Sequence, residues 1–200
     1  MSVVSGEGMP SPYNGVYIIV INRNLVHMKD VNLMLYAMLG LFTAAIVGLD
    51  QWTKYLSVLY RDTLALEEIH ILGLFRLSYT ENSGAAWSML EGQTWFFLLV
   101  LVAFIAILGV MIWKKWLSKK FELICMAAIL GGALGNAADR VFRGGKVIDM
   151  IEFDFWQSFP TFNVADCFIT LGCAALVVYV LFFDKSKTTQ QENEDTPPAS

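Results

Sequence analysis

The stretch TWFFLLVLVAFIAILGVMIW, residues Thr94–Trp113, decides the class of fold. Its 20 residues include no charged side chain. A helix of this length rises about 30 Å, the thickness of the hydrocarbon core of a bilayer. Three more uncharged stretches of 19, 16 and 17 residues occur in the chain: Val31–Leu49, Leu123–Ala138 and Cys167–Phe183. Four such stretches leave too little amphipathic chain to cover them in water, so the sequence predicts four transmembrane helices.

Composition supports a membrane protein and argues against other classes. Hydrophobic residues make up 56% of the chain and charged residues 16%, whereas soluble domains have about 25% charged residues. A disordered chain is excluded, and an ordinary soluble domain is disfavoured. The net charge of −4 offers no basic surface for nucleic acid. The three cysteines, Cys125, Cys167 and Cys173, lie in apolar runs and are predicted to be small core residues.

Lysines in the short connections predict the orientation in the membrane. By the positive-inside rule, the side that carries most of them is cytoplasmic. They precede the first span, follow the fourth, and lie between the second and third: Lys29, Lys185, Lys187, Lys114, Lys115, Lys119 and Lys120. Both termini are therefore expected in the cytoplasm. The loops Asp50–Gln93 and Asp139–Asp166 are expected on the outer side.

The outer loops are predicted to form small structures at the membrane surface. In the first, the runs Leu64–Leu66, Ile69–Leu77 and Leu77–Thr80, interrupted by Gly73, favour two or three strands. The second has the composition of a segment that dips aromatic rings into the interface: Phe153, Phe155, Trp156, Phe159 and Phe162. The predicted fold class is an all-α integral membrane protein, a four-transmembrane-helix bundle with a small periplasmic β-sheet and an interfacial loop. The alternative interpretation is that both loops are only structural caps over the ends of the helices.

The expected domain lies between two peripheral segments. Residues 1–28 are predicted to be a poorly ordered extension, with Met28 as a candidate natural start. Residues 29–184 form the membrane domain, with spans at about 31–52, 94–114, 122–140 and 165–184 and an outer β region at about 60–92. The polar tail 185–200 is predicted to be disordered.

Polar side chains gather at the outer ends of the four spans. A polar group at membrane depth costs several kcal/mol unless it is paired, so this asymmetry indicates an outward-facing functional site. The residues are Asp50, Gln51, Lys54, Asn82, Asn136, Asp139, Arg140, Asp149, Asn163 and Asp166.

Most of these residues also have a simpler interpretation. Lys54 can snorkel to the interface or pair with Asp50 at i,i+4, and Arg140 with Asp139 can be interfacial charges. The stretch Asn82–Ala86 can be a turn. Three glycines are more typical of close helix packing than of chemistry: Gly131, Gly132 and Gly135.

Asp149 and Asp166 are harder to explain as structural residues. Asp149 lies in the apolar run Val147–Ile151, and Asp166 opens the fourth span. Two close carboxylates cannot both ionise readily, so one retains a proton while the other acts as a base. This is the chemistry of aspartic proteases. His27 and His70 offer no metal-ligand companion, and no metal or organic cofactor is expected.

Four motifs at the span ends resemble those of lipoprotein signal peptidases, the signal peptidase II or A8 family of bacterial aspartyl proteases. The motifs are Asp50-Gln51-Trp52-Thr53-Lys54, then Asn82-Ser83-Gly84-Ala85-Ala86-Trp87-Ser88, then Gly135–Arg140 leading to Val147-Ile148-Asp149, and Phe162-Asn163-Val164-Ala165-Asp166. Their order matches the family over roughly residues 28 to 183.

The resemblance implies that Asp149 and Asp166 are the catalytic pair. It also implies that further residues support the site or the bound peptide: Asp50, Lys54, Asn82, Gly84, Ala85, Asn136, Arg140, Asn163 and Ala165. Asp139 is implied to be structural. The implied substrates are diacylglyceryl prolipoproteins, cleaved on the amino side of the lipidated cysteine. The protein is expected to be a monomer in the bacterial inner membrane, in contact with lipids. Globomycin-type cyclic peptides are expected to inhibit it.

The chain departs from the family pattern at a few positions. Trp87 and Met150 stand where Phe is usual, and the stretch from Arg140 to Asp149 is one residue longer around Gly144-Gly145.

Two other functions compete with proteolysis. A proton-coupled transporter would use paired carboxylates as a relay but would need polar residues across the midplane, where only Thr43 and Thr170 occur. The second competing function is that of a non-catalytic factor that binds lipidated peptides.

Overall fold

The structure is a computed structural model that describes residues 14–67, 69–85, 89–117 and 119–183. The described part of the chain divides into two units, with the boundary between Met38 and Leu39. Helix α1 (Asn14–Leu59) includes the described part of the first unit and continues into the second. The predictions for residues 1–13, for Trp87 and for the tail 185–200 lie outside the described residues, whereas residues 14–28 belong to α1.

Within the described residues, four helices are long and apolar enough to cross a membrane, which confirms the predicted fold class. They are residues Leu33–Leu59 of α1, α3 (Thr94–Trp113), α4 (Lys120–Phe142) and α5 (Val164–Phe182). Along α3 only Leu108 is buried, as expected for a helix that is apolar on all sides and contacts lipid. Helix α4 has the most buried residues and is therefore the central helix of the second unit.

Glycines on α4 allow its neighbours to approach closely. A Cβ added at Gly131 would lie 2.9 Å from the Cβ of Ile46 on α1, and one at Gly135 would lie 2.5 Å from Asp50 Oδ2. A Cβ at Gly132 would collide with the backbone carbonyl of Ala165 on α5. The prediction that these glycines serve helix packing is confirmed.

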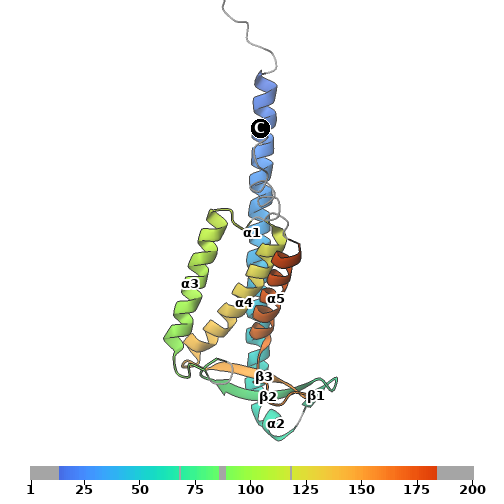
Figure 1. Cartoon of the computed structure of the whole chain (residues 1–200), viewed down its shortest axis with the longest axis vertical. Coiled ribbons are helices and arrows are strands. Elements are labelled where there is room, and N and C mark those ends of the chain that lie inside the picture. Colours follow the sequence, from blue (N-terminus) through green and yellow to red (C-terminus); the bar gives the residue numbers. More distant parts are fainter. Residues whose placement is uncertain (1–13, 68, 86–88, 118, 184–200) are drawn as a thin grey trace, which may run out of the picture. The chain divides into compact units, whose positions relative to one another are not determined.

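A three-stranded antiparallel sheet in the order β1-β2-β3 lies at one end of α3, α4 and α5 (Figure 1). The strands are β1 (Ile69–Ile71), β2 (Phe75–Asn82) and β3 (Val147–Phe153). The predicted break at Gly73 is confirmed, because it separates β1 from β2. The predicted strand at Leu64–Leu66 is wrong, because these residues end the short helix α2 (Arg61–Leu66).

The third strand comes from the second outer loop and was not expected. Residues Val147–Met150 are buried on both faces, so this mostly apolar run lacks the alternation of polar and apolar residues that marks a half-buried strand. The aromatic segment after it packs partly on itself. The ring of Phe153 lies 5.1 Å from that of Phe162 and 5.4 Å from that of Phe75, whereas Phe155 and Trp156 are exposed.

The three cysteines are free, and their environments differ. Cys125 is buried, as predicted, and Cys167 is half-buried. Cys173 is exposed on the surface of α5, so its prediction as a core residue is wrong. An apolar side chain on the surface of a membrane-spanning helix contacts lipid, and sequence hydrophobicity does not distinguish that surface from a core.

Candidate active site

Asp149 is a buried carboxylate held by two side-chain amides. It lies on β3 and is 2% exposed. Asn82, the last residue of β2, donates from Nδ2 to Asp149 Oδ2 at 3.0 Å, and Asn163 donates from Nδ2 to Oδ1 at 2.6 Å. The pKa of Asp149 is raised to about 6. Burial is the largest cause and the negative charge of Asp166 adds to it, while the two amide donors act in the opposite direction.

Asp166 is positioned by the way α5 begins. Asn163 is the N-cap and Asp166 is the third residue of the helix, a spacing that allows a reciprocal capping box. The Asn163 side-chain oxygen accepts from the Asp166 backbone N at 3.0 Å, and Asp166 Oδ2 accepts from the Asn163 backbone N at 3.1 Å. Asn136 on α4 donates from Nδ2 to Asp166 Oδ1 at 2.7 Å. Asn163 therefore contacts both Asp149 and Asp166.

Lys54 lies behind Asn136 in a buried polar cluster. Its side chain is 0% exposed, and Nζ lies 2.9 Å from Asp50 Oδ2, 3.1 Å from Asp139 Oδ2 and 2.8 Å from Asn136 Oδ1. The predicted i,i+4 pair with Asp50 is confirmed, and the snorkelling alternative for Lys54 is wrong. Three acceptors match the three N–H donors of the ammonium group, so the buried charge is satisfied.

The carboxylates of this cluster connect the helices to the site. Asp50 Oδ1 accepts from the backbone N of Ala165, the residue before Asp166, at 3.0 Å. Asp139 Oδ2 accepts from the backbone N of Ile148, the residue before Asp149, at 3.0 Å. Each support residue thus holds the backbone next to one of the two site aspartates. Asp139 is 1% exposed, so the interpretation of Asp139 as an interfacial charge is wrong.

Two residues for which no supporting role was predicted also contact Asp139. Gln51 donates from Nε2 to Asp139 Oδ1 at 3.1 Å, and Arg143 lies 3.2 Å from the same oxygen. Lys146, by contrast, forms an exposed pair with Glu81 at 2.7 Å. Gln51 follows Asp50 directly, but an amide side chain gives no sequence signal for a partner on another helix.

Arg140 faces the site rather than acting as a free interfacial charge. Its Nη2 donates to the backbone oxygen of Gly84 at 2.9 Å, and the guanidinium carbon lies 4.2 Å from the ring centre of Phe97. The Gly84 backbone N donates to Asn82 Oδ1 at 2.9 Å. Arg140 therefore fixes the segment after β2. Its Nε is buried without a partner within the described part of the chain. Phe97 was not predicted, because it is one of many apolar residues on α3.

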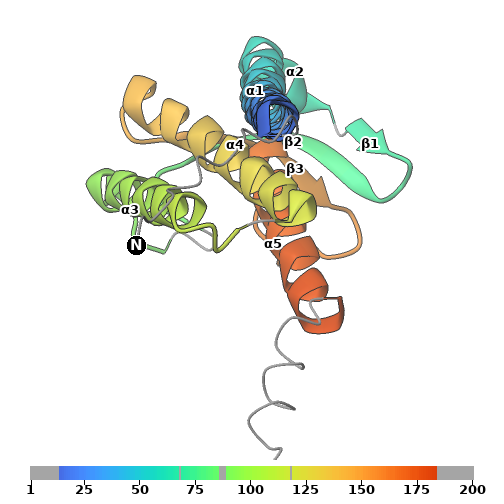
Figure 2. The same ribbon diagram turned by 90° about the horizontal axis from the view of Figure 1, so that it is seen from above.

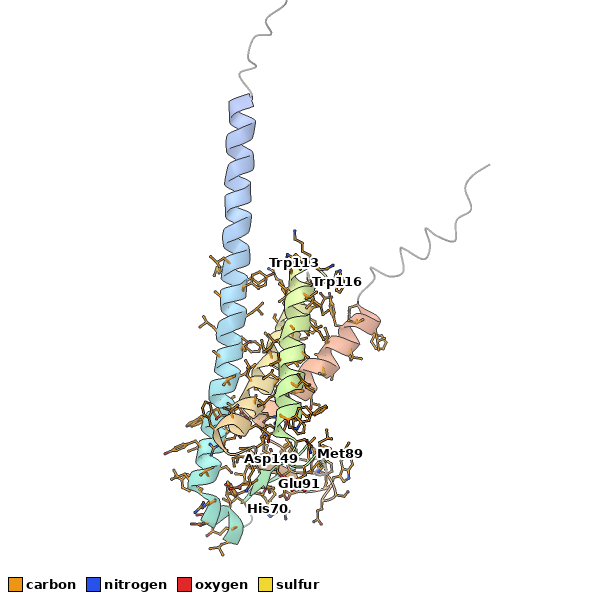
Figure 3. The ribbon with its side chains drawn as sticks, turned by 90° about the vertical axis from the view of Figure 1, so that its left-hand side faces the viewer. His70, Met89, Glu91, Trp113, Trp116 and Asp149 are labelled. Carbon is orange, nitrogen blue, oxygen red and sulfur yellow. The ribbon has the colours of Figure 1, made fainter. Side chains whose placement is uncertain are left out.

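A cavity of about 910 Å³ lies in front of the two aspartates. Its lining includes the predicted site residues Asn82, Gly84, Ala85, Asn136, Arg140, Asp149 and Asp166. The rest of the lining is largely apolar and includes Phe97, Leu101, Ile169 and Phe153. Asp50, Lys54, Asn163 and Ala165 stand behind this lining. Figure 3 labels Asp149 where the sheet meets the helices, and Trp113 and Trp116 at the opposite end.

Two carboxylates line a largely apolar cavity in a protein with four candidate membrane spans, and these are the features of an aspartic peptidase embedded in a membrane. A family model described as Signal peptidase (SPase) II, Peptidase A8, matches residues 42–182. The chain belongs to this family.

Relatives and solved structures agree with the assignment. The chain is 41% identical over 153 residues to the lipoprotein signal peptidase of Geobacillus kaustophilus, covering 76% of this chain and 96% of the relative. It is 37% identical over 146 residues to that of Enterococcus faecalis, covering 73% and 89%. A structure described as a bacterial membrane enzyme aligns with a TM-score of 0.63 at 25% identity, covering 82% of this chain and 95% of the other.

Family membership decides between the functions that the sequence left open. The protein is a multi-pass membrane protein of bacteria that removes signal peptides from prolipoproteins. The transporter and the non-catalytic factor are therefore set aside. The polar network also lies at one end of the helices rather than through their centres, as an enzyme at the membrane boundary requires.

Proposed function

We propose that Asp149 and Asp166 are the catalytic pair of this peptidase. The observation that carries the proposal is that both carboxylates line one cavity while Asn163 contacts each of them, at 2.6 Å and 3.1 Å. Because like charges oppose a second ionisation, such a pair retains one proton. The raised pKa of Asp149, about 6, supports Asp149 as the residue that holds it.

In the proposed reaction, ionised Asp166 takes a proton from water as the water oxygen attacks the scissile carbonyl carbon. Asp149 gives its proton to the carbonyl oxygen, which yields a neutral tetrahedral intermediate. As the carbon–nitrogen bond breaks, Asp166 passes its proton to the leaving nitrogen and Asp149 recovers one from the intermediate. One water is consumed, and both aspartates return to their initial protonation states.

The other polar residues divide into two roles. Asn82, Gly84, Ala85 and Arg140 line the cavity, which supports contact with the bound peptide. Asn136 and Asn163 orient the carboxylates, and Asp50, Lys54 and Ala165 hold the backbone and side chains behind them. The neutral amides suit this orienting role, because they fix the position of a carboxylate without neutralising its charge.

The largely apolar cavity supports a diacylglyceryl-modified prolipoprotein as the substrate, cleaved on the amino side of the lipidated cysteine. Signal peptides are apolar, so such a segment enters from the bilayer without crossing water. Globomycin-type cyclic peptides would occupy the same cavity as inhibitors, and the protein would act as a monomer.

For the orientation, we place both termini in the cytoplasm and the active site near the outer surface of the inner membrane. Lysines at the α3–α4 connection, Lys114, Lys115 and Lys120, support a cytoplasmic position for that end of the helices. The sheet and Asp149 lie at the opposite end (Figure 3).

The proposal is tested by cleavage of a diacylglyceryl prolipoprotein in vitro. Asp149→Asn and Asp166→Asn should each lower kcat by about 10³-fold or more, because each removes a proton-transfer group. Asp62→Asn makes the same chemical change at an exposed residue on α2 and should retain wild-type activity. Activity in either site variant equal to that of Asp62→Asn would refute the catalytic pair.

A further inference from the structure

The sheet has one apolar face and one polar face. Across the three strands, Ile71 pairs with Phe75 and Phe75 with Phe153, which forms an apolar row. The adjacent row pairs His70 with Arg76 and Arg76 with Glu152, and its charged groups form ion pairs. Ile71, Phe75 and Phe153 line the cavity, so the apolar face is the one turned toward the membrane helices.

The turn between β1 and β2 is unusual for a hairpin in water. Leu74 N donates to Ile71 O at 3.1 Å, and the two central residues, Leu72 and Gly73, have φ values of 55° and 65°. Positive φ at both central residues is the type I′ arrangement, in which Asn-Gly is preferred. Here a leucine occupies the first of these positions, with its side chain 88% exposed. A leucine at this position is unfavourable both for the backbone and, in water, for solvation.

The exposed leucine belongs to a larger apolar surface. Leu74 is 50% exposed, and its carbonyl accepts from the backbone N of Asp154 at 3.0 Å, which holds the next two residues beside the turn. These are Phe155, 69% exposed, and Trp156, 50% exposed. We call Leu72, Leu74, Phe155 and Trp156 the tip patch. Aromatic and aliphatic residues of this kind, side by side, favour a lipid interface.

We propose that the tip patch inserts into the lipid of the leaflet that covers the sheet end of the helices and anchors the sheet there. The occupant is lipid because the sheet lies at the end of the membrane-spanning helices where α3 begins, and the first turns of α3 carry exposed apolar side chains such as Trp95 and Leu99. The patch therefore lies at the same end of the molecule as an apolar helix surface that contacts the bilayer. Figure 2 shows the β1–β2 hairpin extending sideways from the sheet, on the side away from α3.

The anchor explains how the sheet keeps its position over the cavity. β1 and β2 are joined to the helical part through the chain segments at their ends and through β3. A second attachment through lipid at the far end of the hairpin resists rotation of the apolar face away from the cavity. Substrate segments then pass from lipid to the cavity beneath a continuous apolar surface. This inference does not depend on which residues are catalytic.

The test uses the full chain in vesicles of phosphatidylglycerol and phosphatidylethanolamine, with a dansyl amino acid in place of Leu72. The matched control places it at His70, on the polar face of the same hairpin. Prolipoprotein cleavage shows that each variant is folded. Quenching by lipids with a nitroxide near the top of the acyl chain should be about threefold stronger at position 72 than at position 70. Quenching by aqueous iodide should show the reverse order.

A further variant tests the role of Leu72 itself. Leu72→Asn suits the type I′ turn but removes the apolar side chain, so nitroxide quenching of a dansyl at position 74 should fall by about twofold or more. Unchanged quenching at position 74 would overturn the anchor. Equal iodide access at positions 70 and 72 would also overturn it. If position 72 is protected from iodide only at a high ratio of protein to lipid, a second copy of this chain covers the patch, and the lipid anchor is overturned.

Discussion

Two groups of carboxylates lie at the same end of this protein and are held in opposite ways. Asp50 and Asp139, which we call the support pair, both contact the ammonium group of Lys54. Asp149 and Asp166, the cavity pair, receive their hydrogen bonds from amides: the side chains of Asn82, Asn163 and Asn136 and a backbone N–H. A cation fixes the charge of a neighbouring carboxylate, whereas an amide fixes mainly its position.

This difference separates structure from chemistry within one polar network. The support pair contacts a cation that matches its charge, and it holds the backbone beside Asp166 and Asp149 through Ala165 and Ile148. In the proposed hydrolysis it is the cavity pair that gains and loses a proton. Asn136 connects the two pairs, because it accepts from Lys54 and donates to Asp166.

Removing the cation should have the largest effect on stability. Lys54→Met leaves the Asp50 carboxylate buried without its ion-pair partner, and breaking a buried pair in this way costs about 3–5 kcal/mol. We expect a lower unfolding temperature in detergent micelles and loss of cleavage. The matched control is Lys146→Ala, which breaks an exposed pair with Glu81 and should cost about 0–1 kcal/mol.

A double variant distinguishes a charge effect from a packing effect. Asp50→Asn in the Lys54→Met background removes the carboxylate left alone, so it should restore part of the lost stability. A double variant less stable than Lys54→Met alone would show that the support pair acts by packing and not by charge compensation.

The close approach of α4 to the support pair gives a smaller expected effect. A Cβ at Gly135 would lie 2.5 Å from Asp50 Oδ2, so Gly135→Ala should displace this carboxylate and destabilise the protein by about 1–3 kcal/mol. Gly109→Ala on α3 is the control, because a Cβ added there would meet no atom within 4 Å among the described residues. Thermal unfolding of both variants is the measurement, and equal unfolding temperatures would contradict the predicted crowding.

Sequence patterns predicted the features that depend on local spacing. The four spans follow from uninterrupted apolar stretches such as Thr94–Trp113, and the start of α5 follows from the spacing of Asn163 and Asp166. The clustering of polar residues at one end of the helices was also predictable, because successive spans run in opposite directions and bring alternate ends to the same side of the membrane. The motifs that indicated the family lie at those ends.

Features that depend on distant partners were not predictable in the same way. The burial of Lys54 requires Asp139, which lies on another helix, so sequence alone left snorkelling open. The strand β3 requires β2 as its partner and is covered on both faces, so its apolar run lacked a strand signature. Leu64–Leu66 had the apolar composition of a short strand, but it continues the helical turn that begins at Arg61.

The smallest expected effect is a shift in pH dependence, and it tests the cavity pair directly. The Asn82 donor stabilises ionised Asp149 and so lowers its pKa, against the larger upward effect of burial. Asn82→Ala removes the donor and should move this pKa above its value of about 6. In the proposed reaction Asp149 must be protonated, so the alkaline limb of kcat/KM should move to higher pH even though the rate at the optimum falls. Ser83→Ala, which removes an exposed hydroxyl bonded to Glu91, should leave the limb in place. If the acidic limb of Asn82→Ala moves to higher pH while its alkaline limb stays in place, Asp149 acts as the base and the two roles in the cavity pair are exchanged.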